Sequence, residues 1–201
     1  MLPDNESITP ESSLVPGRVV VVIPCFRVES RIAEVIAGIP SFVDFIVVVN
    51  DKSPDNTGQI LNGLSHTNKR LVVVHQEENE GVGGATKSGY LEALKLGDEV
   101  IVKIDGDGQM APIYIEPLAT LILARRAEYA KGNRFQNPAF VRTMPAVRKI
   151  GNLGLSFLIK IASGYWNIFD PTNGFTDISA KTLANLNFNR LENRYCLLYT
   201  S

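Results

Sequence analysis

Four short runs of mostly branched apolar residues constrain the fold of this 201-residue chain more than any other feature. Because the apolar character is continuous and does not alternate, both faces of each run are expected to be buried, as in the strands of a parallel sheet. Segments with helical spacing separate the runs, which is typical of an α/β fold. The sequence therefore predicts a doubly wound, mainly parallel sheet with helices on both faces. The runs are VVVVIP at 19–24, FIVVVN at 45–50, LVVVH at 71–75 and EVIVKI at 99–104.

The segments between and after these runs predict the remaining elements. Apolar residues at helical spacing, turn residues at the start and a glycine at the end mark the helices. Helices are predicted at 31–39, within 53–64, at 83–97 and over most of 113–129, with an apolar helical face at 148–166 and a turn followed by a strand at 169–179.

Composition argues against several kinds of partner and cofactor. The chain has 20 basic and 21 acidic residues and a net charge of −1, which gives no support for a nucleic-acid partner. Two cysteines without a CxxC pair argue against zinc and against a disulfide framework. The two isolated histidines, His66 and His75, are expected to be surface or packing residues.

The chain is expected to hold one folded domain over 18–195. Residues 1–17 are polar, contain proline and lack the apolar core of a signal peptide, so we expect a flexible N-terminal tail. No apolar run of about 18 residues occurs, so no spanning helix is predicted and this stretch is expected to be soluble.

Acidic residues follow three of the four predicted strands, at Asp51, Glu77 and Asp105. In open α/β sheets, ligands bind outside the carboxyl ends of the strands. The fourth run continues as DGDGQM, where two glycines allow unusual backbone angles between Asp105, Asp107 and Gln109. Oxygen-only ligands suit Mg²⁺ or Mn²⁺, which leave room for a diphosphate. We therefore predict a metal–diphosphate site here.

Two other interpretations of this segment stay open at the level of sequence. One is a solvated turn, because Asp-Gly pairs are common turn formers. The other is a calcium loop, in which Glu116 would stand at position twelve counted from Asp105. Met110 then occupies the position that needs glycine, which disfavours that reading.

The glycine-rich segment GVGGATKSG at 81–89 lies between a predicted strand and a predicted helix. It does not fit the dinucleotide fingerprint, because Thr86 stands where the third glycine belongs, and it lacks the P-loop spacing. This mismatch argues against a nicotinamide dehydrogenase. We interpret the segment as a close-approach turn that opens a helix, whose amides are available to an anion.

With these residues in place, the chain resembles the family-two glycosyltransferases of the GT-A fold, over about 19–195. Within that family it is similar to the dolichyl-phosphate mannose synthases and bacterial polyprenyl-phosphate sugar transferases. Six motifs occur in the family's order. They are VVIPCF, VVNDKSPDNT, NEGVGGATKSGY, DGDGQM, KGNRF and FDPTNGFTDI.

The resemblance implies a role for each matched position. Pro24 and Phe26 would form walls around the nucleotide base, and Asp51 would hydrogen-bond the base or ribose. Asp105 and Asp107 would hold the metal and the diphosphate, with Gln109 completing the metal shell. Arg134 and Arg148 would bind phosphate oxygens, for which a planar guanidinium is well suited. Asp170 would place the acceptor or sugar, or else cap the turn before Pro171.

The chain departs from the family pattern at three places. Glu29 stands one position later than the glutamate expected to contact the base, and Asn50 replaces a frequent aspartate. After Tyr195 the family usually continues with aromatics, an acidic pair and often membrane-spanning helices. Residues 196–201, CLLYTS, resemble a translated sequencing adapter, so we expect a non-native tail on a C-terminally truncated domain.

The resemblance implies an inverting, metal-dependent transfer of a sugar from a GDP- or UDP-sugar to a polyprenyl phosphate. Such an enzyme would work at the cytoplasmic side of a membrane, through its lipid acceptor or a missing C-terminal segment. A family-two transferase acting on a glycan hydroxyl, for example in cell-surface polysaccharide synthesis, and a non-catalytic nucleotide-sugar-binding fragment are the alternatives.

Overall fold

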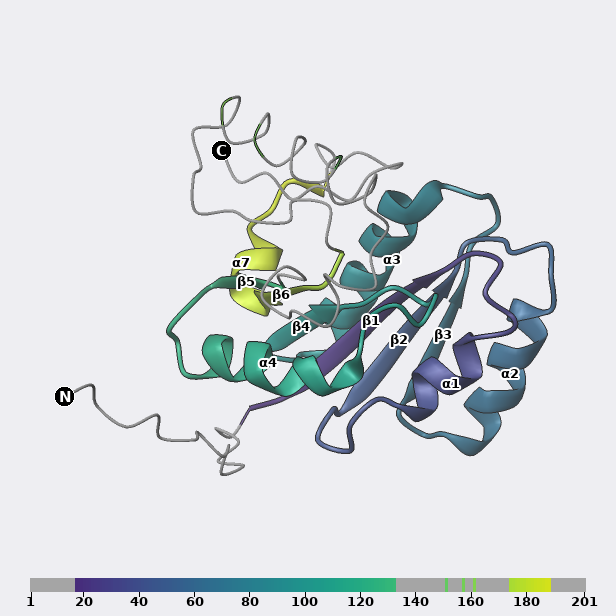
Figure 1. The fold of residues 1–201 in the computed structure, drawn as a ribbon, viewed down its shortest axis with the longest axis horizontal. Helices are drawn as coiled ribbons and strands as arrows, with labels where there is room; N and C mark the ends of the chain where they lie inside the picture. The colour runs from purple at the N-terminus through teal and green to yellow at the C-terminus, as the bar shows by residue number, and fades with distance from the viewer. Residues whose placement is uncertain (1–16, 133–150, 152–156, 158–160, 162–173, 189–201) are drawn as a thin grey trace.

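A computed structural model of the chain describes residues 17–132, 151, 157, 161 and 174–188, which build a twisted sheet with helices on both sides (Figure 1). The sheet has six strands in the order β3-β2-β1-β4-β6-β5. The strands are β1 (Val19–Cys25), β2 (Phe45–Asn50), β3 (Leu71–His75), β4 (Val100–Lys103), β5 (Tyr129–Lys131) and β6 (Thr176–Ser179).

The predicted mainly parallel sheet is confirmed. Strands β1 to β4 pair in parallel, and β6 runs antiparallel to both of its neighbours, β4 and β5. The strands predicted at 45–50 and 71–75 have the observed bounds, and the strand expected late in 169–179 is β6.

The two faces of the sheet carry separate apolar cores. Val21 and Ile23 of β1 belong to the core that also contains side chains of α1, α2 and α4, whereas Val20 and Val22 belong to the core that contains side chains of α3 and α7. This burial on both faces explains why β1 reads as an unbroken apolar run. The helices are α1 (Ile32–Ala37), α2 (Thr57–Thr67), α3 (Gly81–Leu96), α4 (Ile115–Leu123) and α7 (Ala180–Ala184), with a short 3₁₀ turn η1 (Pro112–Tyr114).

The helix predicted over most of 113–129 is shorter than expected. It ends at Leu123, and Arg125 adopts a left-handed backbone with φ of 55°. The Arg125 amide donates to the carbonyl of Ile122 at 2.8 Å, which closes the last turn. Because arginine is a good helix former, the sequence does not mark this stop, and Tyr129 begins β5 where the prediction extended the helix.

The crossovers place the ends of β1 and β4 side by side. Helices α1 and α2 cover one face on the way to β3, and α3 then crosses the other face and returns the chain to β4, beside β1. The strand order therefore reverses between β1 and β4. This switch point is where ligands bind in open α/β sheets.

Helix α3 approaches the sheet closely at Gly89. A Cβ added there would lie 2.4 Å from Val22 Cγ1 and 3.1 Å from Val49 Cγ2, and both valines are fully buried. We expect Gly89→Ala to lower the free energy of unfolding by about 1–2 kcal/mol, because overpacking outweighs the gain of about 1 kcal/mol in helix propensity.

The matched control is Gly63→Ala in α2, where an added Cβ meets nothing within 4 Å. That change should raise the stability, by about 1 kcal/mol at most. Urea unfolding of the two variants measures both effects, and a Gly89→Ala protein as stable as the wild type would contradict the close packing.

Strand β6 contains an unusual buried acid, Asp177. Its side chain is fully buried, and neither carboxylate oxygen has a hydrogen-bond partner among the described residues. It lies opposite Val102 of β4 and Ala130 of β5, on the face covered by α4. Burial raises the pKa of the Asp177 carboxyl well above its ordinary value, so the protonated acid is the form that the fold holds.

Asp177 should therefore make the protein less stable as pH rises. Below the pKa of an unfolded aspartate, about 3.9, both states are protonated and the acid costs nothing extra. Above it only the unfolded chain releases the proton, and stability falls by up to about 1.4 kcal/mol per pH unit until the folded pKa is passed. Asp177→Asn should match the wild type near pH 3.5 and melt several degrees higher at pH 7. Asp107→Asn, which makes the same replacement at an exposed position, is the matched control.

Candidate active site

The loop that follows β4 packs against the end of β1. A Cβ added at Gly106 would lie 2.8 Å from Cys25 Sγ and 3.4 Å from the carbonyl oxygen of Pro24. Glycine at 106 thus lets the acidic loop approach the neighbouring strand. Burial, and then the charge of Asp105, raise the pKa of the Cys25 thiol, so Cys25 is a packing residue.

The first acid of this loop, Asp105, has a cation beside it. Lys103 Nζ, from the last residue of β4, donates a hydrogen bond to Asp105 Oδ1. The Lys103 side chain is 5% exposed and the Asp105 side chain 32% exposed. The negative charge at the strand end therefore has a partner within the protein, and this ion pair was not predicted from the sequence.

The second acid, Asp107, is exposed and organises the turn. Asp107 Oδ1 accepts a hydrogen bond of 2.9 Å from the backbone amide of Gln109, and Gly108 between them has φ of 75°. The loop thus has the turn geometry expected of Asp-Gly pairs. The other carboxylate oxygen, Asp107 Oδ2, accepts no hydrogen bond from the described residues.

This donor set fits a divalent cation that takes few protein ligands. Within the described ranges, no group of three or more acidic, histidine or cysteine side chains could hold a metal. A calcium loop, which needs six to eight oxygens, is therefore not supported. Mg²⁺ and Mn²⁺ are commonly held by one or two carboxylates together with substrate phosphates, and the residues Asp105, Asp107 and Gln109 suit that arrangement.

Asp51, at the end of β2, anchors the start of α3. Its two carboxylate oxygens accept hydrogen bonds from the backbone amides of Glu80, at 2.8 Å, and Gly81, at 2.9 Å. Its own amide donates to the carbonyl of Cys25, and the side chain of Asn79 donates to its carbonyl. The backbone amides at the start of this glycine-rich helix thus bind the carboxylate of Asp51 and not an external anion. Its contact with a base or ribose stays a prediction.

The neighbouring Asn50 links the ends of β2 and β3. Its Oδ1 accepts from the amide of Ser53, which directs Nδ2 toward His75 Nδ1 at 3.1 Å. His75 Nδ1 must then accept, so Nε2 carries the proton and donates to Asn62 Oδ1 at 2.9 Å. His75 is therefore a structural residue, as expected. An aspartate at position 50 would require the other tautomer, with the proton on His75 Nδ1, so Asn50 selects the tautomer of His75.

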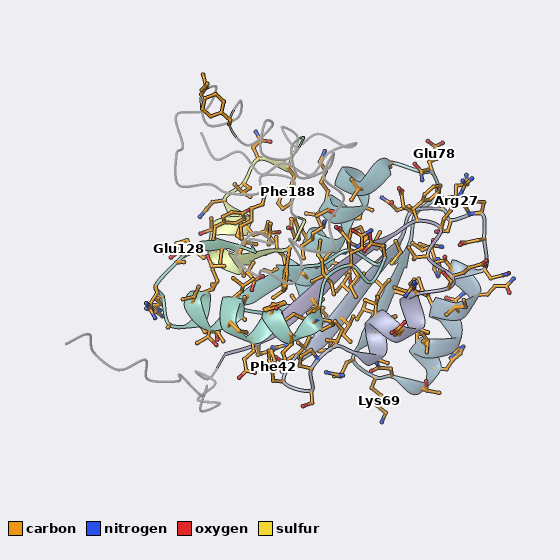
Figure 2. All side chains as sticks on the ribbon, in the orientation of Figure 1. Arg27, Phe42, Lys69, Glu78, Glu128 and Phe188 are labelled. Carbon is orange, nitrogen blue, oxygen red and sulfur yellow. The ribbon has the colours of Figure 1, made fainter. Side chains whose placement is uncertain are left out.

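Loop 26–31 is tied to loop 51–57 by several hydrogen bonds. Glu29 Oε2 accepts from the amide of Asn56 at 2.8 Å, and Asp55 Oδ2 accepts from the amide of Glu29. Glu29 is thus occupied in joining the loops. Arg27 adopts φ of 56°, and its guanidinium lies 5.2 Å from the ring centre of Phe26; Figure 2 shows Arg27 at the edge where β1, β2 and β3 end.

The predicted site residues differ in exposure, and some of them lie outside the described part of the chain. Phe26 is 44% exposed beside the switch point, whereas Pro24 is buried within β1 and offers little surface to a base. Their roles toward a nucleotide stay predictions. Arg134, Arg148 and Asp170 lie outside the described residues, as does most of 148–166. Lys103 was not predicted as a site residue, although a lysine within an otherwise apolar strand was the signal that could have indicated it.

The chain belongs to glycosyl transferase family 2. Residues 20–184 match the model of the family described as "Glycosyl transferase family 2". The family, the GT-A fold and the enzyme class predicted from the sequence are thereby confirmed.

Similar proteins include transferases that use polyprenyl phosphates. A UDP-N-acetylglucosamine–dolichyl-phosphate N-acetylglucosaminyltransferase of Methanococcus voltae is 33% identical, over 87% of this chain and 74% of that protein. An undecaprenyl-phosphate mannosyltransferase of Micrococcus luteus is 30% identical, over 74% of this chain and 60% of that protein. This chain therefore spans between about three fifths and three quarters of the length of these two relatives.

A solved structure supports the fold. Glucosyl-3-phosphoglycerate synthase from Mycobacterium tuberculosis, in complex with Mn²⁺, UDP and glucosyl-3-phosphoglycerate, superposes with a TM-score of 0.61 at 20% identity. The match covers 85% of this chain and 59% of that one. Within the ranges that the structure describes, no helix is both long and apolar enough to cross a membrane.

The anchoring role of Asp51 can be tested without any ligand. We expect Asp51→Ala to lower the free energy of unfolding by about 2 kcal/mol or more, because two amides at the start of α3 lose a charged acceptor. Glu77→Ala, at the exposed acid after β3, should change stability by less than about 0.5 kcal/mol. Chemical denaturation of both ligand-free variants measures the difference, and equal stabilities would contradict the anchor.

Proposed function

We propose that this chain is the donor-binding part of an inverting glycosyltransferase that moves a sugar from a nucleotide-diphosphate sugar to a polyprenyl phosphate. The observation that carries the proposal is the acidic loop at the β1–β4 switch point, in a chain of family 2. Two of its relatives have names that specify dolichyl or undecaprenyl phosphate. Such an enzyme would act at the cytoplasmic face of a membrane.

Each residue of the acidic loop would have its own role in holding the donor. Asp105 and Asp107 would hold Mg²⁺ or Mn²⁺, with Gln109 as a neutral oxygen ligand. When bound, the metal supplies Lewis-acid neutralisation of charge on the leaving diphosphate. The turn through Gly108 fixes Asp107 relative to Gln109 before the donor arrives, so little ordering is left for the binding step.

The other predicted residues would act on the rest of the donor. The exposed ring of Phe26 beside the switch point would stack on the base, and Asp51 would contact the base or ribose while it anchors α3. Arg134 and Arg148 would share the phosphate charge, and Asp170 would place the acceptor or sugar. A phosphate acceptor is already anionic, so this reaction requires no strong general base.

Two alternative functions would use the same acidic loop, because that loop would hold the donor and does not select the acceptor. A transferase to a glycan hydroxyl would use the same donor site but require a base. A fragment that binds nucleotide sugar without turnover would also retain that site. Transfer assays with a short polyprenyl phosphate, compared with an oligosaccharide acceptor, distinguish the three.

The donor site is tested first by thermal shift with UDP or GDP, each with and without Mn²⁺. At a hundredfold excess over its Kd, a ligand adds about 2.7 kcal/mol of stability, a rise of several degrees in Tm. Asp107→Asn should abolish the Mn²⁺-dependent part, while its Oδ1 still accepts from Gln109 and keeps the turn.

The matched control is Glu34→Gln, whose side chain is 82% exposed on α1. It should retain the full shift. A metal-dependent shift with one nucleotide identifies the base; a folded protein that shifts with neither nucleotide would sink the proposed donor site.

A further inference from the structure

Lys103 is a buried cation inside the candidate metal site. It ends β4, where the other three residues are Val100, Ile101 and Val102, and its neighbours across the sheet are Val22 and Thr176. A buried ammonium group is costly unless a carboxylate pairs with it. In the described part of the chain that carboxylate belongs to Asp105, through the hydrogen bond from Nζ to Oδ1.

The pair is enclosed by the segment that leads into β6. A Cβ added at Gly174 would lie 2.6 Å from Asp105 Oδ2, 2.7 Å from Lys103 Nζ and 3.1 Å from Met110 Cε. The backbone at Gly174 therefore approaches both members of the pair closely. The side chain of Met110 also lies beside the pair, and its sulfur accepts a hydrogen bond of 3.4 Å from the amide of Asp105. The ammonium is thus held near the carboxylate by its surroundings as well as by charge.

This arrangement places a positive charge where a divalent cation would need to bind. The ammonium occupies one oxygen of Asp105, and its charge repels a second cation at the other oxygen. Because the Lys103 side chain is 5% exposed, water screens this repulsion poorly. Asp107, exposed on the same loop, has no basic side chain paired with it among the described residues.

We propose that Lys103 is an internal counter-cation that competes with the divalent metal for Asp105. In the free protein it neutralises the carboxylate and keeps metal affinity low. The negative charge of a donor diphosphate offsets the ammonium, so metal and nucleotide bind cooperatively, each raising the affinity of the other by the same factor. This inference rests on the proposed function, because it concerns the same metal site.

The test measures Mn²⁺ binding directly, by calorimetry and by the electron paramagnetic resonance signal of free Mn²⁺. Lys103→Met removes the charge and keeps an unbranched apolar side chain. We expect it to bind Mn²⁺ about tenfold more tightly than the wild type without nucleotide, and to show a smaller increase in Mn²⁺ affinity when UDP or GDP is added. Lys95→Met, which removes a lysine paired with Glu92 on α3, is the matched control and should behave as the wild type.

The outcomes separate this inference from the proposed function. If the wild type binds Mn²⁺ with nucleotide through Asp107 but Lys103→Met binds it no more tightly, competition by Lys103 is wrong and the metal site stands. If neither protein binds Mn²⁺ in an Asp107-dependent way, the metal site itself fails, and this inference with it. Should Lys103→Met not fold, Lys103→Gln keeps a hydrogen-bond donor without charge and must show the same tightening; unchanged affinity there overturns the inference equally.

Discussion

The burial of β1 on both faces is the constraint on which the rest of the structure depends. A strand that must be covered on two sides requires helices on two sides, so the chain crosses one face to reach β3 and the other face to reach β4. The return brings β4 beside β1, and the acidic loop then lies against Pro24 and Cys25 through Gly106. The position of the site is thus a consequence of how the core is divided.

Given that fold, the chain has to accommodate acids that are buried, such as Asp51 and Asp177, or partly buried, such as Asp105, and it does so in three ways. Asp51 is held by two backbone amides at the start of a helix, Asp105 by the ammonium of Lys103, and Asp177 by keeping its proton. The physical reason is the same in each case: a carboxylate that loses contact with water requires a partner or must lose its charge. Only the second solution can be exchanged for a dissolved cation, because amides of a folded helix stay in place. The metal site is therefore expected at Asp105, and Asp51 belongs first to the scaffold.

Much of the fold was predictable from the sequence because it depends on periodicity, which is a local property. The strands β2 and β3 and the helix stop at Gly97 follow from apolar runs and from a glycine in the left-handed conformation. The early end of α4 was not predictable, since Arg125 takes a left-handed conformation that its residue type does not favour. Soon after that stop the chain forms β5 beside β6, a pairing that a local pattern does not reveal.

The candidate site was also predictable only in part. The acids at the strand ends were found because their positions along the chain are visible, but their partners were not, because each partner is remote or ambiguous in sequence. Asp51 binds amides 29 and 30 residues away, and Glu29 is occupied by Asn56 across two loops. Lys103 is only two residues from Asp105, yet alternation in a strand says which face a side chain takes and nothing of where its terminal atom ends.

The enclosure at Gly174 links the donor side of the site to the segment that precedes β6. The backbone at Gly174 lies so close to Lys103 and Asp105 that an added Cβ would collide with both. Movement of the pair toward Gly174 would therefore require that backbone to shift. β6 is hydrogen-bonded to β4 on one side and β5 on the other, which leaves little freedom in the strand itself. A metal that replaced the ammonium at Asp105 would therefore lie close to Gly174, within the motif FDPTNGFTDI, which also contains Asp170, the residue for which the resemblance implies a role toward the acceptor or sugar.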